Sequence, residues 1–247
     1  MALMTLAAVD PRYPPHNLHG QIVHDIGRRI LSGEIRPGDP IPPPVQPASR
    51  TVLREAIKVL AAKGLVESRP KTGTRVRPRH AWNLLDPDVL AWHQESAPKQ
   101  PFLRRLTEVR RIIEPAAAAL AAERADEKAV AALARALRDM ETAVQGREAD
   151  YDAFVEADIR FHLTILKACG NDLLEQMTRV VYSALTVSFR ATSRLPGRAK
   201  ASVPRHKAIF EAITAGNPRR AADAMRHLVQ STAREVDALQ RPGRPGR

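Results

Sequence analysis

One stretch decides the fold of this chain: Ser49-Arg-Thr-Val-Leu-Arg-Glu-Ala-Ile-Lys-Val-Leu-Ala-Ala-Lys-Gly-Leu-Val66. Its pattern predicts a helix that Ser49 caps and Gly64 ends. One face is apolar at helical spacing, with Val52, Leu53, Ala56, Ile57, Val59 and Leu60. The opposite face carries Arg50, Arg54 and Lys58, with Thr51 and Glu55 beside them. A short helix that packs on one side and presents a basic row on the other suits the major groove of DNA.

A hairpin is predicted directly after this helix. Residues 65–69 and 74–77 have the pattern of two short strands, and Pro70-Lys71-Thr72-Gly73 supplies the turn between them. A recognition helix followed by a hairpin with a basic tip is a winged helix-turn-helix. The alternative is an ordinary amphipathic helix with a solvated basic face, and the attached hairpin argues against it.

The net charge of +12 is unevenly distributed along the chain. Residues 1–80 carry 13 Lys or Arg against 6 Asp or Glu, a net of +7, and the tail 241–247 adds +3. The residues between them therefore carry only +2. A basic N-terminal module beside a nearly neutral body indicates a polyanionic partner such as double-stranded DNA.

The composition also indicates a compartment. The single cysteine, Cys169, excludes an intrachain disulfide and suits a reducing cytoplasm. No apolar run approaches the length that a membrane span needs, and the N-terminus does not resemble a signal peptide. We therefore expect a cytoplasmic protein without a membrane partner.

Helical patterns dominate the remaining sequence. A first helix is expected over residues 16–32 and a short helix within the linker 82–92, where Asp86 is the N-cap. From residue 101 onward, helices are expected near 101–124, 126–145, 150–169, 171–194, 199–215 and 218–240. The fold class is therefore mainly α, with an N-terminal winged helix-turn-helix and a C-terminal all-α bundle of six or seven helices.

This pattern divides the chain into five parts. They are an N-terminal tail 1–15, a winged helix-turn-helix domain 16–79, a linker with a short helix 80–98, a helical domain 99–240 and a basic tail 241–247.

Four polar residues fall at or beside apolar positions of three late helices. Asp158 and His162 lie one turn apart among apolar neighbours, and His206 and His227 occur in the two helices that follow 194. An ionised carboxylate in an apolar setting is costly unless it is paired or bound to a metal. One Asp and three His would bind a divalent transition metal such as Zn²⁺ or Ni²⁺. The alternative is a set of separate core histidines, each satisfied by hydrogen bonds.

Several short motifs together resemble one known family. Ser49-Arg-Thr-Val-Leu-Arg-Glu-Ala and Lys63-Gly-Leu-Val resemble the DNA-binding domain of the GntR family of bacterial transcription regulators. Glu108-Val-Arg-Arg-Ile-Ile-Glu-Pro, Asp158-Ile-Arg-Phe-His162, Gly170-Asn171, Arg205-His206 and Met225-Arg-His-Leu228 resemble the helical effector domain of its FadR subfamily. The resemblance covers about residues 16 to 240.

The resemblance implies a homodimer on a palindromic operator, with a small carboxylate effector bound at or beside the metal. It implies that Ser49, Arg50, Thr51 and Arg54 contact DNA, with the wing tip Lys71, Thr72 and Gly73 in the minor groove. It assigns Asp158, His162, His206 and His227 to the metal, which would be zinc, or alternatively nickel or manganese. Arg110 would pair with the effector carboxylate, and Asn171 is either a pocket residue or a helix cap. The linker 82–92 is similar to that of regulators of sugar-acid catabolism, especially the galactonate type.

One segment departs from the family pattern. Members usually carry a full helix before the Ser-Arg that opens the recognition helix. Here the corresponding segment, 41–49, is shorter than in other members of the family. It holds four prolines, at 42, 43, 44 and 47. Proline lacks a backbone donor and breaks helices. We therefore expect the first helix of the helix-turn-helix to be shortened or absent.

Three functions follow from these patterns. The first is a ligand-responsive transcription regulator, most simply a repressor of a carbohydrate-acid operon. The second is a metal and carboxylate sensor whose DNA-binding arm has degenerated. The third is a metalloenzyme that activates water at the Asp/His site, although a basic winged module would then have no use.

Overall fold

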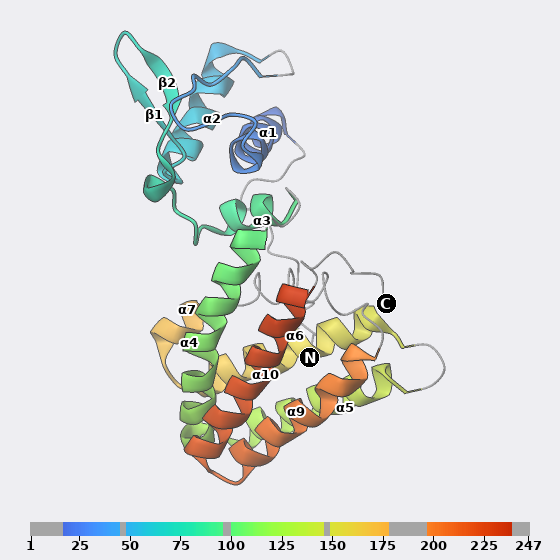
Figure 1. The fold of residues 1–247 in the computed structure, drawn as a ribbon. Helices are drawn as coiled ribbons and strands as arrows, with labels where there is room; N and C mark the ends of the chain where they lie inside the picture. Colours follow the sequence, from blue (N-terminus) through green and yellow to red (C-terminus); the bar gives the residue numbers. More distant parts are fainter. Residues whose placement is uncertain (1–16, 45–47, 96–99, 146–148, 178–196, 239–247) are drawn as a thin grey trace. The chain divides into compact units, whose positions relative to one another are not determined.

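The computed structural model describes residues 17–44, 48–95, 100–145, 149–177 and 197–238 (Figure 1). The chain divides into two compact units, Met1–Lys99 and Gln100–Arg247. No helix in these described ranges is both long and apolar enough to cross a membrane.

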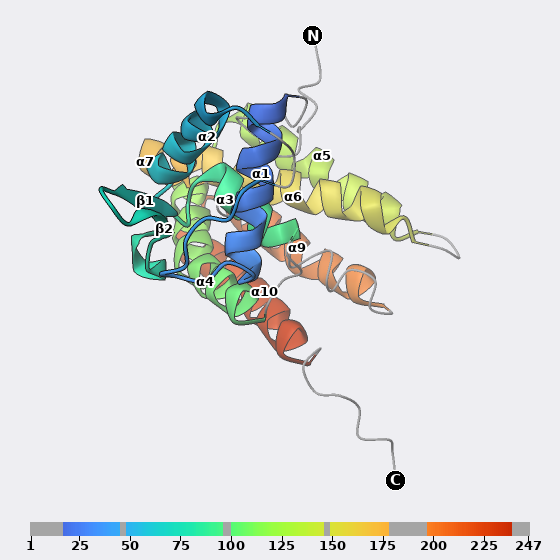
Figure 2. The same cartoon turned by 90° about the horizontal axis from the view of Figure 1, so that it is seen from above.

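The first unit is the predicted winged helix-turn-helix. Its elements are α1 (Leu18–Ser32), α2 (Arg50–Ala62), β1 (Val66–Arg69), β2 (Gly73–Val76), the 3₁₀ turn η1 (Arg79–Ala81) and α3 (Pro87–Glu95) (Figures 1 and 2). The Ser49 hydroxyl accepts the Val52 N–H at 3.3 Å, as the expected N-cap of α2. The strands pair antiparallel from Val66 opposite Val76 to Arg69 opposite Gly73. The predicted helix and hairpin are therefore confirmed.

The segment between α1 and α2 holds no helix in its described residues, 33–44 and 48–49. Instead, residues 38–41 run beside β2. The Gly38 N–H donates to the Val76 carbonyl at 2.9 Å, and the Ile41 N–H donates to the Thr74 carbonyl at 3.0 Å. Prolines supply no such donors and cannot continue a helix. The predicted shortening is confirmed for the described residues.

Helix α2 is only partly buried. Ala56 and Leu60 are fully buried. The other predicted apolar positions, Val52, Leu53, Ile57 and Val59, are only partly buried. In the described residues α2 packs mainly on α1 along one side.

The linker packs with the first unit. Val89, Leu90 and Trp92 of α3 are buried, and α3 packs on α1. The N-cap of α3 is Asp86, as expected, since its Oδ1 accepts the N–H groups of Asp88 and Val89 at 3.0 and 3.3 Å. The described part of the linker, through Glu95, thus belongs to the winged unit.

The second unit is a helical bundle, as predicted. Its described helices are α4 (Gln100–Arg124), α5 (Glu127–Ala143), α6 (Tyr151–Ala168), α7 (Asp172–Gln176), α9 (Arg198–Thr214) and α10 (Pro218–Ala238). The principal helix pairs are α4 with α10, α5 with α6, and α9 with α10 (Figures 1 and 2). Most of the helix expected over 171–194 lies outside the described residues. Many small alanines in the core, such as Ala117, Ala121 and Ala157, let the helices approach closely.

Candidate functional site

The basic row of α2 lies at the surface of the winged unit. Ser49, Arg50, Thr51 and Arg54 are all exposed, so each proposed DNA contact is accessible. The row is partly neutralised by Glu55. Its Oε1 lies 2.9 Å from Lys58 Nζ and 3.7 Å from Arg54 Nε. The hydrogen bond from Lys58 lowers the pKa of Glu55, which is therefore ionised.

The wing tip is also exposed. Lys71 and Thr72 lie in the turn between β1 and β2, and Gly73 begins β2. Lys71 and Gly73 have φ values of +68° and +77°, in the left-handed region. Glycine adopts that conformation without steric cost, which explains its place at the end of the turn. The Lys71 side chain is thereby carried at the tip of the hairpin.

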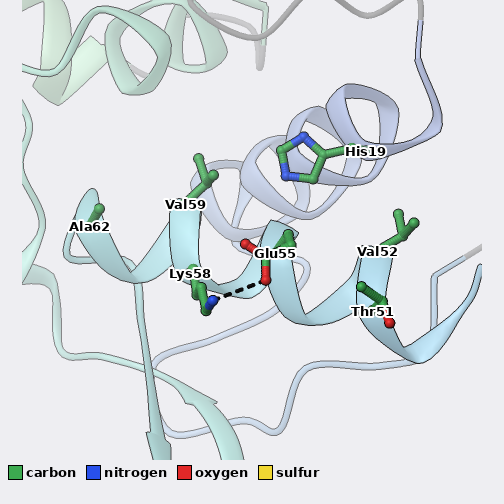
Figure 3. Close-up of a pocket in the computed structure, with 7 residues that line it drawn as sticks. All are labelled: His19, Thr51, Val52, Glu55, Lys58, Val59 and Ala62. Atoms are coloured by element: carbon green, nitrogen blue, oxygen red, sulfur yellow. Dashed lines mark hydrogen bonds and ion pairs between the residues drawn. The ribbon is translucent and has the colours of Figure 1, made fainter.

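An open groove runs along one flank of α2. It is lined by His19 of α1 and by Thr51, Val52, Glu55, Lys58, Val59 and Ala62 of α2 (Figure 3). The apolar members Val52 and Val59 face the same space as His19 in this view.

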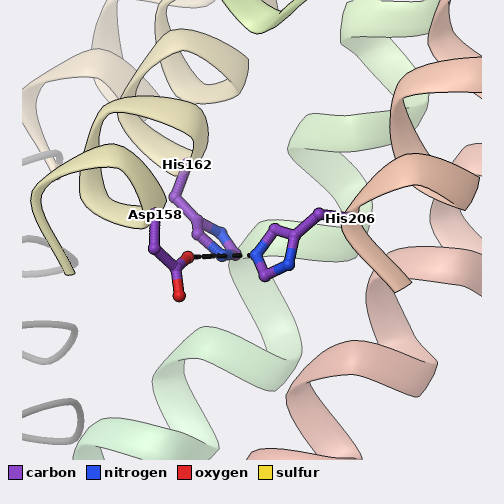
Figure 4. Close-up of side chains that lie close together, drawn as sticks. All are labelled: Asp158, His162 and His206. Carbon is purple, nitrogen blue, oxygen red and sulfur yellow. Dashed lines mark hydrogen bonds and ion pairs between the residues drawn. The ribbon is translucent and has the colours of Figure 1, made fainter. Parts of the chain in front are cut away.

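A second group of residues meets inside the helical unit. Asp158 and His162 lie on α6 and His206 on α9, and all three are buried (Figure 4). His206 Nε2 lies 3.0 Å from Asp158 Oδ1, and His162 Nε2 lies 3.2 Å from the same oxygen. One ligand atom from each residue lies within 4.8 Å of the others. The structure thus brings together three of the four residues that the sequence selected.

The fourth residue does not join them. His227 is exposed on α10, so its predicted place in the metal site is wrong for this structure. The buried face of α10 is formed by Ala221, Met225, Leu228 and Val229. A residue two positions after Met225 is rotated by roughly 200° around the helix axis, which turns His227 toward solvent.

Glu114 was missed by the sequence analysis and lies next to His162. Glu114 Oε2 is 3.0 Å from His162 Nδ1, and both side chains are buried. The Arg110 guanidinium donates to Glu114 through Nε at 2.6 Å and through a terminal nitrogen at 3.3 Å. Arg110 and Glu114 are four residues apart in the motif 108–115, a spacing that places them on one helix face and could have revealed the pair.

Arg110 and Asn171 therefore have structural partners in this molecule. The Arg110 side chain is 1% exposed and pairs with Glu114. Asn171 is exposed and caps α7, because its Oδ1 accepts the N–H groups of Leu173 and Leu174, both at 3.1 Å. That either residue contacts an effector stays a prediction from the resemblance to the FadR subfamily.

The charges of this buried network stabilise one another. Burial alone would lower the pKa of His162, but the Glu114 and Asp158 carboxylates outweigh it and raise the pKa to about 9. Burial alone would raise the pKa of Glu114, but Arg110 and His162 lower it to about 2. His206 and His162 likewise hold the pKa of Asp158 far below its usual range despite burial.

These residues fit a divalent metal. His206 Nδ1 lies 3.0 Å from the Ser202 carbonyl oxygen. A carbonyl only accepts, so Nδ1 carries a proton, while Nε2 lies 3.0 Å from Asp158 Oδ1, where it can donate to the carboxylate or bind a metal ion beside it. Asp158 Oδ2 is buried without a hydrogen-bond partner in the described residues. Two imidazoles and a carboxylate are a donor set that Zn²⁺ accepts.

A pH dependence follows for the metal-free protein. The raised pKa of His162 stabilises the fold below about pH 6.5 and loses that effect as the pH rises toward 9. The lowered pKa of Glu114 stabilises the fold above about pH 4.5 and loses its effect toward pH 2. Thermal unfolding after chelation, followed by far-UV circular dichroism, should show a maximum between about pH 4.5 and 6.5. A midpoint that stays constant from pH 6.5 to 9 would contradict the charged network.

Two family models match the chain. Residues 18–76 match "Bacterial regulatory proteins, gntR family", and residues 105–231 match the FCD domain. The chain is therefore a DNA-binding transcription regulator of the GntR family with an FCD domain. The family models and relatives are all regulators, which excludes the metalloenzyme hypothesis.

Among its relatives is the galactonate operon transcriptional repressor of Escherichia coli (strain K12). It is 34% identical over 233 residues, which cover 90% of this chain and 98% of the relative. The HTH-type transcriptional regulator LutR of Bacillus subtilis (strain 168) is 32% identical and covers 79% of this chain and 90% of its own. The solved structure of Lar, which controls the agr system of Listeria monocytogenes, has a TM-score of 0.59 at 17% identity. It covers 91% of this chain and 98% of the other, and supports the fold alone.

Proposed function

We propose that this regulator is a repressor of an operon for sugar-acid catabolism, released from DNA by a small carboxylate. The single observation that carries the proposal is the pairing of an exposed basic α2 with the buried Asp158, His162 and His206 in one chain. The similarity to a galactonate operon repressor supports the class of effector. The protein would bind a palindromic operator as a homodimer.

The proposed roles of the exposed residues in DNA binding follow from their exposure and charge. The exposed Arg50 and Arg54 would contact base edges and phosphates, with Ser49, Thr51 and the wing tip nearby. Phosphate contacts make such binding strongly dependent on salt. The effector would shift the dimer toward a geometry that does not match successive major grooves, which requires different effector affinities in the two states.

In the helical unit, Asp158, His162 and His206 would hold a divalent metal, with zinc favoured over nickel or manganese. The bound metal would supply open coordination positions for a carboxylate oxygen. Arg110 would attract the same carboxylate, because its guanidinium is permanently charged and lies buried beside Glu114 and His162.

The test is a titration of the full chain against the DNA upstream of its own gene, with and without D-galactonate and other sugar acids. We expect salt-sensitive, sequence-specific binding that one acid releases. The second candidate function, a sensor with a degenerate DNA-binding arm, is favoured by the lack of a helix in the described residues between α1 and α2. Absence of specific binding at every salt concentration would support that sensor and contradict the repressor.

Glu114 provides a further prediction for this site. Replacing Glu114 by Gln keeps its size but removes the negative charge beside His162 Nδ1. Loss of a group that orients a metal-binding histidine typically lowers metal affinity about 10- to 100-fold. We expect this loss for Zn²⁺ in competition with a chelating dye. The matched control is Glu108→Gln, on the exposed face of the same helix, which should bind zinc like the wild type.

A further inference from the structure

The described residues between α1 and the recognition helix α2, 33–44 and 48–49, hold no helix that could support α2. Its flank toward the groove of Figure 3 is open, and only Ala56 and Leu60 are fully buried along its length. The direction of α2 determines which base edges its exposed side chains can reach. A contact elsewhere on α2, away from this flank, would keep the helix in the required direction.

The end of α2 carries such an attachment. Lys63, the C-cap residue, places its Nζ 2.8 Å from Asp86 Oδ1 and 2.5 Å from Asp88 Oδ2. The side chains of Lys63, Asp86 and Asp88 are only 5%, 13% and 1% exposed. Burial alone lowers the pKa of Lys63, but hydrogen bonds to the two carboxylates outweigh it and raise the pKa. Lys63 is therefore a buried ammonium held by the start of α3.

The backbone reinforces this attachment. The Asn83 N–H donates to the Lys63 carbonyl at 3.0 Å. Gly64 has a φ of +74°, and a Cβ there would lie 2.2 Å from the Ala81 carbonyl oxygen. Only glycine permits this approach. The segment that leads into α3 thus crosses directly over the end of α2.

The other end of the connection lies on α1. Trp92 of α3 is fully buried, and its Nε1 donates to His24 Nδ1 at 2.8 Å. A Cβ on Gly27 would lie 2.5 Å from the Trp92 ring, so the ring packs directly on the α1 backbone. Lys63 Nζ lies 5.9 Å from the centre of the same ring. Helix α3 is therefore attached to both α1 and α2.

We propose that α3 braces the recognition helix in place of the missing helix, with Lys63, Asp86, Asp88 and Trp92 as positioning residues for DNA recognition. This inference rests on the proposed role of α2 in operator binding. The DNA-binding unit then extends through Glu95, beyond residue 76 where the family model for the winged domain ends.

The test compares Lys63→Met in the full chain with Arg29→Met, which removes ion pairs to Asp25 and Glu34 at the surface of α1. Specific binding to the upstream DNA should weaken at least about tenfold in Lys63→Met, because misdirected side chains lose base contacts. Binding to unrelated DNA should change less than about threefold, because it depends on exposed charges. The Arg29 control should change neither. Equal specific binding by Lys63→Met and the wild type would overturn the brace.

Hydrogen exchange provides a measurement that needs neither DNA nor a folded variant. In the wild-type chain, the backbone amides of Leu60 in α2 and of Leu90 and Trp92 in α3 should exchange with the same free energy of opening. Asp88→Asn, a milder change, should speed exchange in both helices together. If α3 exchanges freely while α2 stays protected, the brace is refuted. If the wild-type protein does not bind DNA specifically, the proposed function is contradicted. Common opening of α2 and α3 would in that case still support the attachment of α3 to α2.

Discussion

The double replacement Arg50→Ala/Arg54→Ala should weaken specific operator binding about 30- to 10⁴-fold, since a good base contact contributes about 1–3 kcal/mol. Both arginines are exposed, so the fold should not change. Fluorescence anisotropy at several salt concentrations is the appropriate measurement. The slope of affinity against salt should also fall if either arginine contacts a phosphate.

The matched control is Arg135→Ala/Arg138→Ala, which removes two exposed arginines from α5 in the helical unit. It changes the net charge equally but leaves α2 intact. Both tryptophans, Trp82 and Trp92, lie in the winged unit, so their fluorescence can confirm that this unit remains folded. Unchanged specific binding by the Arg50/Arg54 variant would show that α2 is not the recognition helix.

Replacing His206 by Ala should lower the zinc affinity by more than about 100-fold, because loss of an outer-shell group alone costs about 10- to 100-fold. His206 is buried with its Nε2 toward Asp158, and it would be one of three protein ligands. Metal content after dialysis and competition with a chelating dye would measure the loss.

His227→Ala is the control that the structure itself supplies. His227 was selected by the same sequence pattern but is exposed on α10. It should retain the zinc affinity of the wild type. The opposite result, with His227 essential and His206 dispensable, would refute the site as described here.

The local elements of the winged unit were predictable because short-range chemistry determines them. The cap at Ser49, the apolar spacing of α2 and the turn at Pro70–Gly73 act within a few residues. The prolines after Ile41 predicted the lack of a helix for the same reason. Which flank of α2 stays open depends on how α2 packs on α1, and this packing belongs to the tertiary structure.

The candidate metal site was only partly predictable. Asp158 and His162 lie one turn apart, so their common face follows from helix geometry alone. His206 required the approach of α9 to α6, and His227 was excluded only by the rotation of α10. Glu114 entered through the packing of α4 beside α6, which joins residues far apart in sequence.

The amino-acid sequence by itself determined the class of this protein: a basic capped helix, a wing and an alanine-rich bundle with inward polar residues. These features depend on spacing and capping within single elements. The tertiary structure decided which polar residues meet, and it attached the linker helix α3 to the end of α2 through Lys63. Such contacts depend on the angle and rotation of whole helices, which side-chain packing across the core determines and no single segment encodes.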